Sequence, residues 1–247
     1  MQIIAKSDIG NVREINQDYV DYRILNESET IAVLCDGMGG HKAGEVAALM
    51  TCQYILDHFE NHDVFLNDED IQNWMSTVIN NANELLMKES SSNKAYEGMG
   101  TTVVLCYIRD EYCYISHVGD SRAYYFNEAG LNQLTRDDTL VNALVDCGSI
   151  TMDEALTHPR KNILLQAVGA TDNLKVSFYK QKFEKGLILL CSDGLSNSLH
   201  DQQMTDILIH DFDKENVASE LMHQSLIYGG SDNISFIILD KGVFKDE

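Results

Sequence analysis

Apolar residues recur at helical spacing in three segments of the 247-residue chain. Residues 67–88 begin with an Asn and an Asp that can cap a helix and continue with an amphipathic pattern. The apolar positions of this pattern are Ile71, Trp74, Met75, Val78, Ile79, Ala82, Leu85 and Leu86. A second helix is predicted from about Ala43 to Phe59. A third is predicted from about Lys214 to Tyr228, where Asp213 can cap the start and Gly229 can end the helix.

Short runs of β-branched and aromatic residues predict strands between and after these helices. The runs are TIAVLC (30–35), TTVVLCYI (101–108), EYCYISHV (111–118), SRAYYF (121–126), LKVSFYKQK (174–182), LILLC (187–191) and ISFIIL (234–239). The links RDE and NEAG predict hairpins. Many antiparallel strands with grouped helices indicate an α+β fold, in which sheets stack face to face under helices, rather than alternating βα units.

Residues 135–173, called the flap below, interrupt this series of strands. They contain two short helical segments, TLVNALVDC (139–147) and MDEALTH (152–158), before the single proline, Pro159. We interpret the flap as an insertion. The chain shows no repeat, low-complexity linker or break in composition, so we expect residues 1–247 to form one domain.

Composition and charge exclude several classes of protein. The hydrophobic fraction of 44% and the charged fraction of 23% are typical of a globular protein. The net charge of −21 argues against nucleic-acid and anionic-membrane surfaces, which are bound through clustered Lys and Arg. No apolar run is long enough for a signal peptide or a membrane span, so we expect a cytoplasmic protein without membrane insertion.

The six cysteines form no CxxC pair, and several lie in apolar, strand-like runs. Reduced cysteine behaves there as a small hydrophobic residue. We therefore expect buried thiols rather than disulfides or a zinc site.

Four aspartates lie where a predicted strand meets a turn: Asp36 in VLCDGMGG, Asp120 in HVGDSR, Asp193 in LLCSDGL and Asp232 in GGSDNISF. Each alone can be ordinary turn chemistry, and Asp120 can be neutralised by Arg122. Carboxylates that converge on one rim of a sheet sandwich repel one another unless protonated or bridged by a cation. Oxygen ligands without a His or Cys cluster favour Mg²⁺ or Mn²⁺, and two such ions can activate water for attack on phosphorus.

The motif RxxNQD supplies Arg13, whose planar guanidinium suits bidentate binding of a phosphate, together with Gln17 and Asp18. The alternative for Arg13 is a surface ion pair. A lone strong cation close to an acidic metal site is what a phosphoryl substrate would require.

The glycine-rich segment DGMGGHKAGE (36–45) can be read as a nucleotide-phosphate loop. Lys42 is followed by Ala43 rather than by Ser or Thr, and no GxGxxG or Rossmann-like series surrounds it, which disfavours that interpretation. The glycines more readily allow a tight turn at which the Gly37 carbonyl can face a metal. His41 is the histidine nearest in sequence to this site, and we assign it no catalytic role.

These motifs resemble those of the metal-dependent type 2C protein phosphatases, the PPM family, in their short bacterial form. The resemblance runs nearly from end to end. It comprises RxxNQD (13–18), DGMGGH (36–41), GMGTT (98–102), VGDSR (118–122), HPRKN (158–162) in the flap, SDGL (192–195) and SDN (231–233).

The resemblance implies a four-layer α-β-β-α sandwich that hydrolyses phosphoserine and phosphothreonine in proteins without a covalent enzyme intermediate. It implies two central Mn²⁺ or Mg²⁺ ions and a third, outer ion. By the same resemblance, the residues involved are Asp36, the Gly37 carbonyl, Asp193 and Asp232 for the central ions, Asp18 through water, Asp120 with Asp193 for the third ion, Arg13 for the phosphate, and Thr101 and Thr102 as supporting strand residues.

Three departures from the family pattern stand out. Gln17 replaces a residue that is often Glu, which weakens one outer anion. Met38 stands where animal members have a His proposed as general acid, so the proton donor is left open. The flap reads Asp137, Asp138, Thr139 where bacterial relatives usually have Asp-His-Ser or Asp-His-Thr.

The resulting expectation is a monomeric signalling phosphatase that acts on phosphorylated proteins and opposes a bacterial Ser/Thr kinase. Two alternatives stay open. One is a non-catalytic phosphoprotein-binding module that has lost its metals, against which the presence of Asp36, Asp193 and Asp232 argues. The other is a metal-dependent hydrolase of small phosphate esters or phosphoaspartate.

Overall fold

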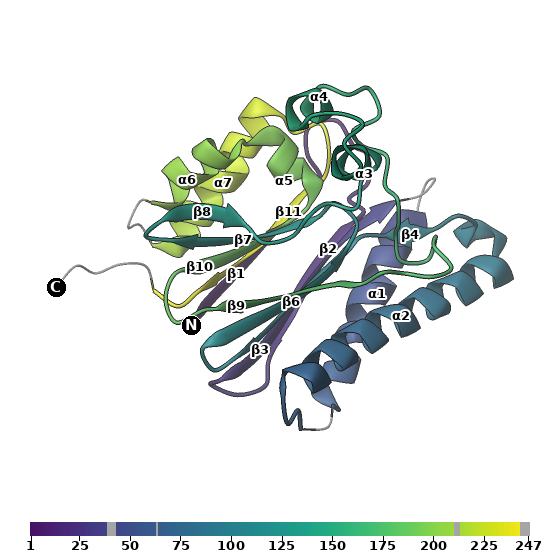
Figure 1. Ribbon diagram of the computed structural model, residues 1–247, viewed down its shortest axis with the longest axis horizontal. Coiled ribbons are helices and arrows are strands. Elements are labelled where there is room, and N and C mark those ends of the chain that lie inside the picture. The colour runs from purple at the N-terminus through teal and green to yellow at the C-terminus, as the bar shows by residue number, and fades with distance from the viewer. Residues whose placement is uncertain (39–42, 63, 210–212, 243–247) are drawn as a thin grey trace.

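Two antiparallel sheets pack face to face in the computed structural model, which describes residues 1–38, 43–62, 64–209 and 213–242 (Figure 1). The first sheet has the order β1 (Gln2–Asp8), β11 (Ile234–Asp240), β10 (Leu187–Cys191), β7 (Arg122–Asn127), β8 (Gly130–Gln133). The second has the order β2 (Asp18–Ile24), β3 (Glu29–Met38), β5 (Val103–Arg109), β6 (Tyr112–Val118), β9 (Ser177–Lys182), and the short β4 (Gly100–Thr101) pairs with β3.

Helices cover the outer face of each sheet (Figure 1). On the second sheet lie α1 (Ala43–Glu60) and α2 (Asp68–Ser92), followed by the short 3-10 helix η1 (Lys94–Tyr96); on the first lie α5 (Asp193–Ser198), α6 (Asp201–Leu208) and α7 (Lys214–Tyr228). The order of layers is therefore helix, sheet, sheet, helix. The predicted α+β sandwich is confirmed.

Three apolar clusters fill the spaces between the four layers. β3 shows how one strand serves two of them: Ile31, Val33 and Cys35 face the core under α1 and α2, whereas Ala32 and Leu34 face the core between the sheets. Successive side chains of a strand point to opposite faces, so a strand buried on both sides must be apolar throughout. This is why the run TIAVLC is continuous rather than alternating.

The three predicted long helices are present. The Asn67 side chain accepts a hydrogen bond from the Asp70 N–H and caps α2, which continues to Ser92, beyond the predicted end. Helix α7 has its predicted bounds, with Asp213 as N-cap and Gly229 as C-cap. Among the helices of the described ranges, none has both the length and the apolar character needed to cross a bilayer.

Several elements were absent from the sequence prediction. Strands β1 and β2 lie at sheet edges and alternate only weakly between buried and exposed residues. Helices α5 and α6 have only six and eight residues, and β8 has four. The run predicted to form a strand over residues 174–182 becomes one only from Ser177.

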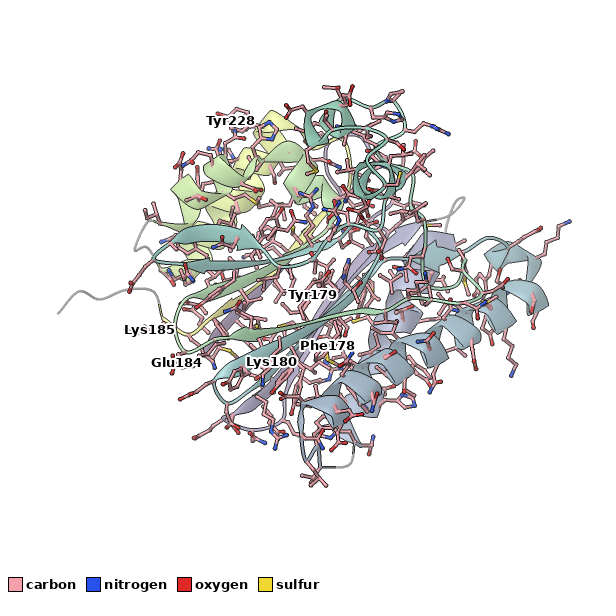
Figure 2. The ribbon with its side chains drawn as sticks, viewed as in Figure 1. Phe178, Tyr179, Lys180, Glu184, Lys185 and Tyr228 are labelled. Atoms are coloured by element: carbon pink, nitrogen blue, oxygen red, sulfur yellow. The ribbon has the colours of Figure 1, made fainter. Side chains whose placement is uncertain are left out.

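Strand β9 forms the other edge of the second sheet, and its side chains tie that edge to both cores. Phe178 packs against the core beneath α1 and α2, and Tyr179 against the core between the sheets. The next residue of the strand is Lys180 (Figure 2). It pairs with Asp68 at the start of α2, and its ammonium lies 4.1 Å from the centre of the Tyr112 ring. A lysine at an edge strand also discourages pairing with a foreign strand.

The flap contains α3 (Leu140–Asp146) and α4 (Met152–Leu156) and lies at one end of the sandwich (Figure 1). Its exit is anchored on the second sheet and on α2. Thr101 and Val168 exchange two backbone hydrogen bonds of 2.9 Å. The buried Asn83 side chain accepts from the Gly169 N–H at 2.6 Å and donates to the Thr171 carbonyl at 2.9 Å.

All six cysteines are free thiols. Five of them, Cys35, Cys52, Cys106, Cys113 and Cys191, are buried as predicted. The prediction was wrong for Cys147, which is exposed. It lies at the end of α3, a short flap helix that buries only Val141 among its residues.

Candidate functional site

The predicted site aspartates come from four different regions of the fold. Asp18 and Asp36 pair directly opposite each other in the ladder between β2 and β3. Asp36 lies within β3, two residues before its end, rather than in a turn. Asp120 follows β6, Asp193 begins α5 directly after β10, and Asp232 precedes β11. The fold brings the five aspartates together, so that the charges of the other four act on Asp36.

Burial and mutual repulsion make these carboxyl groups hard to ionise together. Burial, followed by the charges of the four neighbouring aspartates, raises the pKa of Asp36 well above its usual range. Burial raises the pKa of Asp18 to about 6, although the Ser192 hydroxyl donates to its Oδ2 at 2.8 Å. Burial and then the charge of Asp193 raise the pKa of Asp120 to about 7.

Asp193 interacts with two neighbouring aspartates, Asp232 and Asp36. Its pKa is raised by burial and by the charge of Asp232, while a side-chain hydrogen bond with Asp36 opposes the rise. A cation bound among these carboxylates would offset their mutual repulsion.

The donor set fits a divalent cation that prefers oxygen ligands. Asp18 is 8% exposed, and its Oδ1 has no hydrogen-bond partner among the described atoms. Such an orphaned acceptor is costly unless a ligand satisfies it. Within the described ranges, no group of three or more Asp, Glu, His or Cys side chains is arranged to hold a metal as it stands.

Arg13 is exposed and donates from Nη2 to Asp232 Oδ2 at 2.7 Å. The surface ion pair considered as its alternative role is therefore present, and its partner is one of the predicted metal ligands. The hydrogen bond to Asp232 raises the pKa of Arg13, so the guanidinium stays charged.

Asn233 holds the loop that carries Arg13, a role that the sequence did not reveal. Its Nδ2 donates to the carbonyls of Ile9 at 2.9 Å and Ile15 at 3.0 Å, and its Oδ1 accepts from the Gln17 N–H at 2.9 Å. The signal was present, because Asn233 belongs to the SDN motif directly after Asp232.

Thr101 and Thr102 fix the backbone of Asp36. The Thr101 hydroxyl donates to the Asp36 carbonyl at 2.9 Å, and the Thr102 N–H donates to the same oxygen at 2.8 Å. The Asp36 N–H donates to Thr102 Oγ1 at 3.1 Å. Both threonines therefore support the site by holding the backbone of Asp36 in place.

Gly37 allows the start of α1 to approach β3 closely. A Cβ at this position would lie 2.1 Å from the carbonyl oxygen of Gly44, far inside van der Waals contact. A side chain at residue 37 would therefore push the helix away from the site. Gly39, Gly40, His41 and Lys42, on which the turn and loop interpretations rested, lie outside the described residues.

Asp120 is not simply a turn residue neutralised by Arg122. The Arg122 guanidinium donates to Asp137 from Nη2 at 2.7 Å and from Nε at 3.0 Å, and from Nη1 to the Tyr124 hydroxyl at 3.0 Å. Arg122 is thus committed to the flap, and its charge only partly offsets the rise in the pKa of Asp120.

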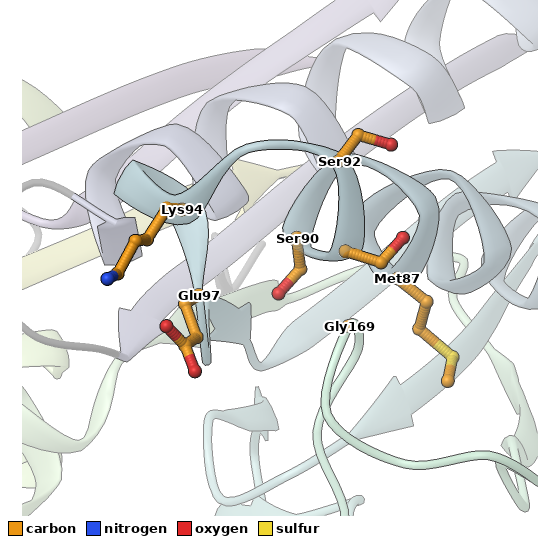
Figure 3. A pocket seen from close by; sticks show the side chains of 7 residues that line it. Met87, Ser90, Ser92, Lys94, Glu97 and Gly169 are labelled. Carbon is orange, nitrogen blue, oxygen red and sulfur yellow. The ribbon is translucent and has the colours of Figure 1, made fainter.

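A cavity of about 740 Å³ extends from the aspartates to the flap. Asp120 and Asp193 line one part of it, and the flap residues Val141, Met152 and Leu156 line another. A second hollow, of about 620 Å³, lies at the end of α2 (Figure 3). Its serine hydroxyls bond to neighbouring backbone, and none of the predicted site residues lines it.

Comparison with known proteins identifies the fold. The serine/threonine phosphatase Stp1 from Staphylococcus aureus superposes with a TM-score of 0.90 and 33% identity, over 97% of this chain and 94% of that one. The serine/threonine phosphatase PstP/Ppp from Mycobacterium tuberculosis superposes with a TM-score of 0.85 and 30% identity, over 97% of both chains. The fold is that of bacterial serine/threonine phosphatases.

Sequence comparison agrees. The family model described as protein phosphatase 2C matches residues 11–226. The serine/threonine phosphatase stp of Listeria welshimeri is 33% identical over 241 residues, 97% of this chain and 96% of that protein. The protein phosphatase PhpP of Streptococcus pneumoniae is 32% identical over 97% of both chains. This chain belongs to the protein phosphatase 2C family, as its motifs predicted.

Proposed function

We propose that this protein hydrolyses phosphoserine and phosphothreonine in proteins in a reaction that depends on divalent cations. The observation that carries the proposal is the convergence of Asp18, Asp36, Asp193 and Asp232, four carboxylates whose mutual repulsion a bound cation would relieve. Relatives of 32 to 33% identity are named serine/threonine phosphatase or protein phosphatase, which supports the same reaction.

The residues that would hold the ions are those of the convergent cluster. Asp36, the Gly37 carbonyl, Asp193 and Asp232 would hold two central Mn²⁺ or Mg²⁺ ions, Asp18 would contribute through water, and Asp120 with Asp193 would hold a third. When bound, such ions supply an activated water for attack on phosphorus and neutralise charge on the phosphoryl oxygens.

Arg13 would bind and orient the substrate phosphate. Its side chain is 52% exposed at the edge of the aspartate cluster, so it can turn from Asp232 towards a ligand. A guanidinium presents two parallel N–H donors that match two phosphate oxygens. The loop that carries Arg13 is fixed by Asn233, which reduces the entropy lost on binding.

The domain organisation, localisation and partners that we propose are those expected from the sequence. Residues 1–247 form one domain, with the flap at about 135–173 as an insertion, and the apolar cluster shared by the two sheets supports this unity. The protein is proposed to be a cytoplasmic monomer in signalling that acts on phosphorylated proteins and opposes a Ser/Thr kinase. Its net charge of −21 disfavours nucleic acid as a partner.

The proposal is tested by phosphate release from peptides of one sequence that carry phosphoserine, phosphothreonine or phosphotyrosine. We expect release from the first two with Mn²⁺ or Mg²⁺ and none with chelator. Binding of the phosphopeptides without release would favour the non-catalytic module. Hydrolysis of para-nitrophenyl phosphate or acetyl phosphate, but of no peptide, would favour the small-ester hydrolase.

A further inference from the structure

Asp138, at the entry of the flap, holds both backbone groups of Gly119. The Asp138 N–H donates to the Gly119 carbonyl at 2.8 Å, and Asp138 Oδ2 accepts from the Gly119 N–H at 2.9 Å. Gly119 directly precedes Asp120. Asp138 therefore fixes the peptide groups on both sides of Gly119, including the one that joins Gly119 to Asp120.

The same carboxylate oxygen also closes the base of the flap. Asp138 Oδ2 accepts a second hydrogen bond, of 2.7 Å, from Gln166 Nε2, and the Asp138 carbonyl accepts from the Leu165 N–H at 2.8 Å. Gln166 in turn pairs with the backbone of Lys175, through bonds of 2.9 and 3.0 Å. Asp138 thus connects the Gly119 turn with the entry and the exit of the flap.

Gly119 is held from its other side by Thr102. Its φ of +107° is a conformation that favours glycine, and a Cβ at this position would lie 2.6 Å from Thr102 Cγ2. Thr102 also bonds to the backbone of Asp36. The turn before Asp120 is therefore held between Thr102, which also bonds to Asp36, and Asp138, which also bonds to Gln166 and Leu165.

Asp138 differs in its contacts from the residues beside it. Asp137 and Thr139 line the large cavity, and Asp137 pairs with Arg122. Both hydrogen bonds to the Asp138 side chain reach a single oxygen. A carbonyl oxygen with two lone pairs could accept both, so the acceptor and not the negative charge is required.

We propose that Asp138 is a positioning residue, which ties the Gly119–Asp120 turn to the base of the flap and so keeps Asp120 in place beside Asp193. The proposal rests on the proposed function in so far as it assigns Asp120 a part in the reaction. The hydrogen-bonded bridge is itself independent of that function.

The first test measures the bridge without activity. Amide hydrogen exchange at Gly119 is followed in the wild type, Asp138→Ala and Asp138→Asn. Loss of the acceptor should speed exchange roughly tenfold in Asp138→Ala, whereas Asp138→Asn should stay close to the wild type. Asp153→Ala, which removes an exposed flap aspartate, is the matched control and should change nothing. Unchanged exchange in a folded Asp138→Ala would overturn the proposal.

The second test uses phosphate release from one phosphopeptide at saturating Mn²⁺. Asp138→Ala should lower kcat by roughly tenfold and leave KM nearly unchanged, and Asp138→Asn should restore most of kcat. Gln166→Ala leaves the hydrogen bond between Gly119 and Asp138 intact, so its kcat should fall less than that of Asp138→Ala. This variant can still test the proposal if Asp138→Ala does not fold. Equal damage in Asp138→Asn and Asp138→Ala would contradict an acceptor role.

Failure of the inference and failure of the proposed function give different results. If the wild type releases no phosphate from any peptide, the proposed function fails, and the exchange measurement still decides whether Asp138 holds the turn. If the wild type is active and Asp138→Ala combines faster exchange with normal kcat, Asp138 is structural only, and the positioning role is rejected.

Discussion

Asp18 and Asp36 are directly opposite residues in the antiparallel ladder of β2 and β3. Directly opposite side chains of antiparallel strands lie on one face of the sheet with their Cβ atoms about 4.5 to 5.5 Å apart, and like charges there are destabilising. Strand pairing alone therefore forces two acidic groups together before any ligand binds. Burial raises the pKa of Asp18 to about 6, and burial followed by the charge of Asp18 raises the pKa of Asp36; a bound cation would favour the ionised form of both groups.

Removing either central carboxylate should abolish turnover. Asp36→Asn or Asp193→Asn takes an anionic ligand from the proposed ion site, and we expect kcat/KM for a phosphopeptide to fall by at least about a hundredfold. Folding should survive, because the isosteric amide also removes repulsion between neighbouring carboxylates. Asp57→Asn, on the exposed face of α1, is the matched control. Near-normal activity of either site variant at saturating Mn²⁺ would show that the site is wrongly placed.

Loss of Arg13 should weaken recognition of phosphate and leave the ions bound. A charge-assisted hydrogen bond contributes roughly 1.5 to 3 kcal/mol, so we expect kcat/KM to fall about ten- to hundredfold in Arg13→Ala. Inorganic phosphate should inhibit this variant less strongly. Arg13→Lys keeps the positive charge but lacks the planar guanidinium, so its kcat/KM should lie between those of the wild type and Arg13→Ala. An unchanged kcat/KM would leave Arg13 as the ion-pair partner of Asp232 only.

Asp120→Asn should separate the outer ion from the central pair. Asp120 shares only Asp193 with the proposed central ligands, so we expect two Mn²⁺ ions to remain bound while kcat falls strongly. Bound Mn²⁺ is counted by calorimetry on the same preparation that is used for kinetics. Full activity with two ions would make the third ion dispensable, and loss of all ions would move Asp120 into the central site.

The metal-free protein should lose thermal stability as pH rises from about 5 to about 8. The pKa values of Asp18 and Asp120 are raised from 3.8 to about 6 and about 7. Between the ordinary and the raised values, the folded state binds more protons than the unfolded state, so the free energy of unfolding falls with rising pH. Mn²⁺ should therefore raise Tm more at about pH 8 than at about pH 5.

Asp120→Asn provides the control for this prediction, because it removes one of the titrating groups. Its Tm should fall less with pH than that of the wild type when both are measured with chelator. Parallel curves for the two proteins would show that Asp120 is already ionised in the metal-free fold.

The sequence was sufficient for the layers and for most of the site, because both depend on local patterns. Asp36, Asp120, Asp193 and Asp232 were recognisable from short motifs at strand ends, and α2 from its periodicity and cap. The fold was confirmed, whereas the roles of the aspartates stay predictions. Strands β1 and β2 were not recognised, since an edge strand with partly exposed residues carries little alternation.

The roles of residues that act through distant hydrogen bonds could not be predicted in this way. Asn233 bonds to Ile9 and Ile15, more than two hundred residues away in sequence, and Asp138 bonds to Gly119 and Gln166. Nothing in the local pattern of either residue reveals its partners. The prediction for Cys147 was wrong for a different reason. Its burial was inferred from the residue type, but the short flap helix α3 buries too little surface to cover it.

The pairing of β1 with β11 has a consequence for how the protein is made. Arg13 and Asn11, which follow β1, meet Asp232 and Gly230, which precede β11, and these two strands are neighbours in the first sheet. During translation, the amino-terminal half of this contact leaves the ribosome first and cannot form the contact until residues 230–240 have been synthesised. A nascent or truncated chain that lacks residues 230–240 cannot assemble the site. The proposed activity would therefore require residues 230–240, and translation products that stop before them would be unable to dephosphorylate proteins in the cell.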